Sequence, residues 1–320
     1  KTTAKTQDIY RRDDKTASIP QLSCLGAAYN DIDNIYNEKA METVLYTRAV
    51  SDSLLKIFEG EIDFFVGSVD VEIDIPKTQT INNNAIAIVL GVEKYKNVSD
   101  VTYASRDAHF MAQYFENMFG IDKNNIYLKK NNDVTKGEFD KLFSDGGWLS
   151  NRVKKGVTDI YFYYAGHGAP DLKSKSGYLI PHDGDPNYPS QTGYSIEMLN
   201  EKINSLGAKS NTIFLDACFS GANRESDMLL ADARPVFIEV EKPKTRKGSI
   251  FSASSGTQIS SSWPEKKHGL FSYFLMKGLR GYADKNNDSK LTLNELNNYI
   301  KDNVTLTASN MDREQNPTFN

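Results

Sequence analysis

The chain has 320 residues, a formal net charge of −4, and 39% hydrophobic and 25% charged residues. This length accommodates one large domain or two smaller ones, with a sizeable buried core. The acidic balance, without a basic stripe interleaved with aromatic side chains, argues against a nucleic-acid partner. No apolar run approaches the roughly 18 residues that span a bilayer, so we expect a soluble protein without a membrane partner. The chain begins at Lys1, which indicates a trimmed or mature form and leaves a secreted, periplasmic or cytoplasmic location open.

Residues 1–83 form an N-terminal extension or prodomain in our interpretation. The first 18 residues are polar, a helix is expected around 42–58, and residues 62–76 show strand-like alternation. Cys24 lies in a small apolar patch, where a thiol usually packs as a small hydrophobe. We place the domain boundary near residue 83, after a polar connector.

From residue 84 to 320 apolar strands alternate with helices. This order predicts an α/β fold with a mainly parallel sheet covered on both faces. In such sheets, ligands bind beyond the carboxyl ends of the strands. The expected strands are 85–92, 125–130, 159–166, 211–217 and 248–255, and the expected helices are 104–119, 136–153 and 268–281.

Two of these strands end on reactive residues beside glycines. "IYFYYAGHGAP" delivers His167 between two glycines, and "TIFLDACFSGA" delivers Cys218. An imidazole next to a thiol raises the thiolate fraction and can return the proton to a leaving amine. The N–H groups of Gly168 and Cys218 are candidates for an oxyanion hole. Taken singly, a strand-end histidine or a buried cysteine is more often structural, so the prediction depends on the pair.

These motifs resemble a known family. "YYAGHG" followed by "DACFSG", with Cys218 51 residues after His167, is similar to the caspase–metacaspase superfamily of cysteine peptidases (clan CD), and to its prokaryotic metacaspase-like members. "AIVLGVEKY", "SRDA" and "HGLFSYFLMKGLRG" extend the resemblance over residues 85–320. It implies a caspase-like αβα sandwich, peptide-bond hydrolysis by His167 and Cys218, a large-subunit part at 84–222, a connector at 223–247 and a small-subunit part at 248–320.

The resemblance also bears on the substrate. Caspases carry Gln-Ala-Cys and cut after aspartate, whereas Asp216 stands in the place of that glutamine here, and Asp107 matches a second acid of the specificity pocket. Two carboxylates in one pocket favour cleavage after Arg or Lys, because a substrate cation compensates their buried charge. The alternatives are a helix-start charge for Asp107, a turn-stabilising acid for Asp216, and aspartate specificity if Arg106 faces the pocket. Trp263 is a candidate substrate contact or an ordinary core residue.

The connector at 222–247 lies where caspases are cut between their subunits. A peptidase specific for basic residues could cleave itself there, although charged loops are usually only solvated. Its basic residues are Arg224, Arg234, Lys242, Lys244, Arg246 and Lys247.

Residues 284–295, "DKNNDSKLTLNE", match the pattern of an EF-hand calcium loop. Position 6 of this loop is Ser289 rather than glycine. The alternative is a capping box between Thr292 and Glu295 that starts a helix without any metal. The predicted ligands are Asp284, Asn286, Asp288, the Lys290 carbonyl, Thr292 and Glu295.

The sequence therefore predicts a cysteine endopeptidase that acts on polypeptides, needs no cofactor for its chemistry, and is influenced by Ca²⁺ if the loop binds it. The alternatives are a catalytically silent caspase-fold scaffold, an aspartate-specific protease, and a transferase or esterase that uses the same dyad.

Overall fold

The computed structural model describes residues 69–171, 173–219, 248–255 and 258–320. By its contacts the chain divides into two compact units, residues 1–73 and 74–320. The expected helix at 42–58, Cys24 and the basic residues of the connector lie outside the described residues. No helix in the described ranges is long and apolar enough to cross a membrane.

The strand-like alternation over 62–76 is not borne out in its described part. Residues 70–74 form turns and bends. The Glu72 N–H donates to the Val69 carbonyl at 2.8 Å, and the Glu72 carboxylate accepts from the Val69 N–H at 2.8 Å. These two bonds close a tight turn, which overrides the alternation of apolar residues.

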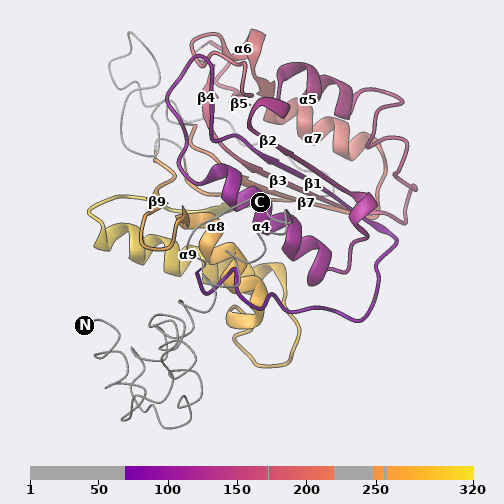
Figure 1. The fold of residues 1–320 in the computed structure, drawn as a ribbon, viewed down its shortest axis with the longest axis vertical. Helices are drawn as coiled ribbons and strands as arrows, with labels where there is room; N and C mark the ends of the chain where they lie inside the picture. The colour runs from indigo at the N-terminus through magenta and orange to yellow at the C-terminus, as the bar shows by residue number, and fades with distance from the viewer. Residues whose placement is uncertain (1–68, 172, 220–247, 256–257) are drawn as a thin grey trace, which may run out of the picture. The chain divides into compact units, whose positions relative to one another are not determined.

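The order of elements from residue 85 is the predicted alternation (Figure 1). The strands are β1 (Ala85–Gly91), β2 (Ile126–Lys130), β3 (Asp159–Ala165), β4 (Gly168–Pro170), β5 (Gly177–Leu179), β6 (Tyr194–Ser195), β7 (Ser210–Asp216), β8 (Ser249–Ser252), β9 (Ser262–Trp263), β10 (His268–Gly269) and β11 (Thr318–Phe319). The helices are α4 (Ala104–Asn117), α5 (Lys136–Phe143), α6 (Pro189–Thr192), α7 (Ile196–Ser205), α8 (Leu270–Lys277) and α9 (Leu293–Asn310), with 3₁₀ turns η2 (Lys123–Asn125) and η3 (Asn131–Asp133) and a π-helical turn η4 (Gly278–Tyr282).

The main sheet has six strands in the order β11-β8-β7-β3-β1-β2. Its pairs are parallel except for β11, which runs antiparallel to β8. All seven residues of β1 are buried, as expected for a strand covered on both faces. The α/β class with a mainly parallel sheet is thus confirmed.

Alternate residues of the strands face the two helical layers. Ile88, Phe162 and Ile213 belong to one core cluster with residues of α5 and α7. Tyr161 faces the other side, where its ring lies 5.5 Å from Phe115 of α4, and α8 and α9 belong to the same layer as α4 (Figure 1). At Gly91 an added Cβ would lie 2.5 Å from the Ala108 Cβ, so α4 packs directly on the β1 backbone.

Two predicted helices are shorter than expected. The helix expected at 136–153 ends at Phe143. The segment expected as one helix over 268–281 begins as a strand, because His268 and Gly269 pair with Trp263 and Ser262 in the hairpin β9–β10. It then forms α8, followed by η4, where Gly281 has a φ of 102°. A second small sheet, β4-β5-β6, follows the end of β3.

Candidate active site

The ends of β3 and β7 bring His167 and Cys218 to the same edge of the sheet. The two strands are parallel and pair Ala165 with Asp216, and the Gly166 N–H donates to the Asp216 carbonyl at 3.2 Å. His167 and Cys218 each stand two residues beyond this registered pair. The sequence reasoning placed them there because parallel strands deliver their carboxyl ends to one edge.

His167 is buried, with 3% of its surface exposed, and its ring is fixed by two neighbours. Nε2 lies 2.8 Å from the Ser99 carbonyl oxygen. A carbonyl can only accept, so Nε2 carries the proton and Nδ1 is the basic nitrogen of the neutral ring. The Tyr95 ring lies 4.7 Å from the imidazole, and its hydroxyl accepts from the His167 N–H at 2.7 Å. The imidazole is therefore set up as a base through Nδ1.

Cys218 is a free thiol that is 5% exposed. Its Sγ accepts a hydrogen bond from the Ser260 N–H at 2.8 Å. The thiol also lies 3.7 Å from the Ser260 carbonyl oxygen, to which it can donate. The same contact places the Ser260 backbone directly against the sulfur.

Gly168 lies against the backbone of the cysteine. An added Cβ would stand 2.4 Å from the Cys218 carbonyl oxygen and 2.5 Å from the Phe219 ring, which explains why glycine is required. Gly168 stands opposite Leu179 in the β4–β5 ladder, and the Ile180 N–H donates to the His167 carbonyl at 3.0 Å. Hydrogen-bonded and non-bonded pairs alternate along an antiparallel ladder, so the Gly168 N–H points away from β5. This orientation suits an oxyanion donor.

Asp216 is fully buried and is held by two hydroxyl groups. Ser260 donates to its Oδ1 at 2.6 Å, and Ser272 of α8 donates to its Oδ2. Tyr163 lies 2.6 Å from Ser272, whose proton is used by the carboxylate, so the tyrosine hydroxyl donates to the serine. These donors are neutral, so they orient the carboxylate without supplying a countercharge.

Asp107 is also fully buried. Its Oδ1 lies 2.6 Å from Nδ1 of His268, and its Oδ2 accepts from the Gly269 N–H at 3.0 Å. Gly269 is the N-cap of α8, and Ser272, which binds Asp216, lies in the first turn of the same helix. The structure therefore brings both predicted acids to the start of α8, where the helix dipole stabilises negative charge.

Arg106 and Trp263 lie in aromatic surroundings. The Arg106 guanidinium stands 5.6 Å above the Phe110 ring, whereas the neighbouring Asp107 bonds to α8. Trp263 is partly buried, with its ring 5.0 Å from Tyr273 and 5.6 Å from Phe274. Its place beside α8 agrees with a core role for one face of the indole.

The sequence analysis did not assign roles to four residues of this site: Tyr95, Ser99, Ser272 and His268. Ser99 acts through its backbone carbonyl, so its side chain carries no signal. Ser272 and His268 lie in a segment interpreted as a helix, and their contacts depend on where α8 begins.

The predicted calcium loop has part of the expected geometry. Asp284 accepts from the Asp288 and Ser289 N–H groups at 3.3 and 2.9 Å, and Asn286 Oδ1 accepts from the Asp288 N–H at 2.9 Å. Ser289 has a φ of 63°, the left-handed conformation that favours glycine. These bonds close the loop around its first oxygen donors.

The second half of the loop forms the capping box. Glu295 Oε2 accepts from the Thr292 N–H and hydroxyl at 3.0 and 2.7 Å, and Thr292 Oγ1 accepts from the Glu295 N–H. The Lys290 N–H donates to Asp288. Among the described residues, no three His, Cys, Asp or Glu side chains cluster as a metal site. The side-chain oxygens of Asp284, Asn286 and Asp288 accept from N–H groups of the loop, and Glu295 is bonded within the capping box.

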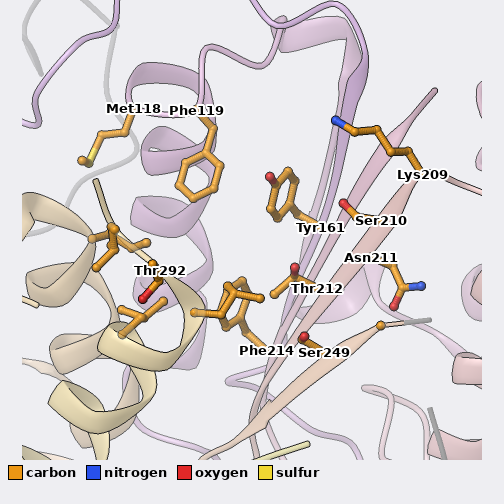
Figure 2. Close-up of a pocket in the computed structure, with 15 residues that line it drawn as sticks. Met118, Phe119, Tyr161, Lys209, Ser210, Asn211, Thr212, Phe214, Ser249 and Thr292 are labelled. Atoms are coloured by element: carbon orange, nitrogen blue, oxygen red, sulfur yellow. The ribbon is translucent and has the colours of Figure 1, made fainter. Parts of the chain in front are cut away.

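A separate hollow of about 750 Å³ lies at the opposite end of the strands (Figure 2). Phe119 and Tyr161 form one side of it, and Ser210 and Thr212 from the start of β7 another. Leu293 of α9 completes the lining near the loop at 284–295. This hollow is distinct from the edge that carries His167 and Cys218.

Two solved structures and one family model are similar to this chain. The crystal structure of the Drosophila initiator caspase Dronc matches with a TM-score of 0.51 and 11% identity, covering 80% of this chain and 92% of that chain. The structure of pro-sf-caspase-1 matches with a TM-score of 0.47 and 14% identity, covering 80% and 94%. A search of curated proteins gave no match. The caspase-domain profile of the C14 peptidases matches residues 84–320. The chain therefore belongs to the caspase-domain family of cysteine peptidases, and its predicted caspase-like fold is confirmed.

Proposed function

We propose that the chain is a cysteine endopeptidase that cleaves peptide bonds after Arg or Lys. The observation that carries this proposal is the registered end of β3 and β7, which brings a histidine with a basic Nδ1 and a thiol that accepts an N–H to the same edge of the sheet. Both groups lie at the carboxyl edge of a parallel sheet, where ligands bind in such folds.

The reaction divides into two steps. Nδ1 of His167 accepts the proton of Cys218, and the thiolate adds to the carbonyl carbon of the substrate. The N–H groups of Gly168 and Cys218 stabilise the oxyanion that forms. The imidazolium then protonates the leaving amine, and a thioester remains on Sγ. Water, deprotonated by the same imidazole, adds to the thioester and releases the acid and the thiol.

The preference for Arg or Lys is supported by the two carboxylates at the start of α8. Asp216 accepts from the neutral hydroxyls of Ser260 and Ser272, and Asp107 is bonded to His268 and to the Gly269 N–H. Carboxylates are the groups to which a substrate guanidinium or ammonium group bonds most strongly. Entry of a peptide requires movement of the segment around Ser260, because Cys218 is only 5% exposed and the Ser260 N–H contacts its sulfur.

The decisive experiment is turnover of matched peptides that end in Arg, Lys or Asp before the reporter group. We expect thiol-dependent cleavage of the Arg and Lys peptides and none of the Asp peptide. Cleavage of the Asp peptide alone would contradict the specificity. The burial of Sγ and both acids favours one other candidate, a catalytically silent scaffold, and the absence of any thiol-dependent turnover would support it.

Two finer proposals accompany the activity. The first is self-cleavage in the connector at 222–247, after one or more of its basic residues. The purified wild-type chain should yield two fragments that a Cys218→Ala chain does not yield. An uncut wild-type chain under conditions of full peptide turnover would contradict self-cleavage.

The second is a Ca²⁺ influence through the loop at 284–295. Asp284, Asn286, Asp288 and the Lys290 carbonyl would hold the ion, with Thr292 and Glu295 joining them if the capping box opens. Calorimetric titration of wild type and Asp284→Ala with Ca²⁺ tests this directly. Equal heats for the two proteins would rule out the loop as the site.

A further inference from the structure

Outside the dyad, His268 is a titratable residue at the carboxyl edge whose side chain is held in place by its contacts. It is fully buried, and its Nδ1 lies 2.6 Å from Oδ1 of Asp107. The backbone of the next residue, Gly269, donates to the other oxygen of the same carboxylate. One short segment, the junction of β10 and α8, therefore fixes both oxygens of Asp107.

The ring of His268 is also held from two sides by aromatic residues. Phe110 of α4 meets it edge-on with centroids 6.0 Å apart, and Tyr273 of α8 lies at 6.4 Å. On its strand, His268 stands opposite Trp263. The imidazole consequently has little freedom to swing away from Asp107.

The same junction connects Asp107 to the nucleophile. Gly269 pairs with Ser262, and two residues earlier the Ser260 N–H binds Cys218 Sγ. One turn into α8, Ser272 binds Asp216. The segment 260–272 therefore supplies hydrogen bonds to Asp107, Asp216 and the sulfur of Cys218.

We propose that His268 is a specificity-determining residue, which aligns Asp107 and sets the negative charge available to a basic substrate side chain. This inference rests on the proposed function. A neutral His268 donates through Nδ1–H and leaves the charge of Asp107 unchanged, whereas a protonated His268 adds a positive charge beside that carboxylate. Histidine ordinarily changes charge between pH 5 and 8, so the preference for Arg falls as the pH is lowered.

Other charged and titratable groups lie near the ring, and their effects on the measured preference have to be distinguished from the effect of His268. Asp107, Arg106 and His109 come from α4, Tyr273 and Lys277 from α8, and Lys266 from the β9–β10 hairpin. Of these, His109 is the other histidine, and histidine ordinarily changes charge between pH 5 and 8. It is partly exposed and lies 2.9 Å from Gln113, so His109→Asn is a matched control.

The test is the ratio of kcat/KM for two peptides that differ only in Arg or citrulline before the scissile bond. Citrulline has the shape of arginine without the charge, and His167 and Cys218 act on both peptides, so their titration cancels in the ratio. Between pH 8 and 5.5 we expect the wild-type ratio to fall by about tenfold, mainly through KM of the Arg peptide. His109→Asn should behave like wild type.

Two variants of the pair sharpen the result. His268→Asn keeps a donor toward Asp107 but cannot become charged, so its ratio should stay at the high-pH level throughout. Asp107→Asn removes the charge that His268 modulates, so its ratio should be low and independent of pH. Thermal melting of each variant at both pH values shows whether it is folded.

The outcomes separate the two proposals. A wild-type ratio that favours Arg but does not change with pH overturns the role of His268 alone, as does a His268→Asn variant that keeps the wild-type pH dependence. A preference for aspartate, or the absence of thiol-dependent turnover, overturns the proposed function and this inference together.

Discussion

The polar groups at the two ends of the parallel sheet differ in burial and in hydrogen bonding. At the carboxyl end, His167, Asp107, Asp216 and Cys218 are at most 5% exposed, and each is bound by donors or acceptors from other segments. At the amino end, a hollow of about 750 Å³ is lined by Met118 and Phe119, which follow α4, by apolar residues of α9 and by the polar start of β7. Lys209 is the one charged residue among its described lining residues, and it pairs with Asp159 at 3.3 Å.

The difference follows from the topology. Parallel strands send their carboxyl ends, and the loops that follow them, to one edge, so residues distant in sequence can meet there. Buried polar groups at that edge are stable only when they are fully bonded. The lining of the hollow at the amino end has no set of converging titratable groups among the described residues, so we expect chemistry at the carboxyl end and none at the hollow.

The largest effect is expected for Cys218→Ala. Removing the nucleophile should lower kcat/KM for an Arg peptide by about 10⁴-fold or more. Ser249→Ala at the hollow should leave kcat/KM within about twofold, because surface changes away from the site have small effects. Residual turnover by Cys218→Ala within tenfold of wild type would show that another group is the nucleophile.

Asp216→Asn should have the next largest effect. The change preserves shape but removes the charge that faces the substrate cation, so kcat/KM for the Arg peptide should fall by about 100-fold, and for the citrulline peptide far less. Asp159→Asn is the control at the amino end, where Asp159 pairs with Lys209. Equal losses for the Arg and citrulline peptides would mean that Asp216 supports the fold rather than the specificity.

Gly168→Ala tests the close approach of the two strand ends. The new Cβ would stand 2.4 Å from the Cys218 carbonyl oxygen, so the loops have to separate. We expect a loss of stability of about 1–3 kcal/mol and at least tenfold slower turnover, measured by thermal melting and peptide kinetics. Gly137→Ala in α5 is the control, since its nearest atom is 3.9 Å away, and it should stabilise the helix by about 0.5–1 kcal/mol. Unchanged turnover in Gly168→Ala would argue against an oxyanion role.

The sequence was sufficient to predict the carboxyl end in outline. Apolar strands and the glycines around His167 and Cys218 are local signals, and the parallel order supplies the rule that such ends meet. The meeting of Asp107 with Asp216 at α8 came from the family resemblance, since 109 residues separate the two in the chain and no local pattern connects them.

The structural features that could not be predicted from the sequence depend on contacts between distant segments. Ser99 offers only a backbone carbonyl, which every residue carries. His268 was expected within a helix because the apolar pattern after it is helical, and its strand pairing with Trp263 appears only when the hairpin folds back. The hollow at the amino end likewise arises where α4, β7 and α9 meet, and no single segment encodes it.

The smallest effect that we predict distinguishes the capping box from a metal site. Thr292→Ala removes the cap of α9 and should cost about 1 kcal/mol in the free energy of unfolding, with or without Ca²⁺. Glu295→Gln keeps a capping box, because glutamine can accept the same bonds, but it loses the charge that a calcium ligand needs. Without Ca²⁺ the Glu295→Gln protein should therefore melt close to wild type. If Ca²⁺ raises the Tm of wild type but not that of Glu295→Gln, Glu295 is a ligand of the ion. If Ca²⁺ raises the Tm of both proteins equally, Glu295 acts only in the cap of the helix.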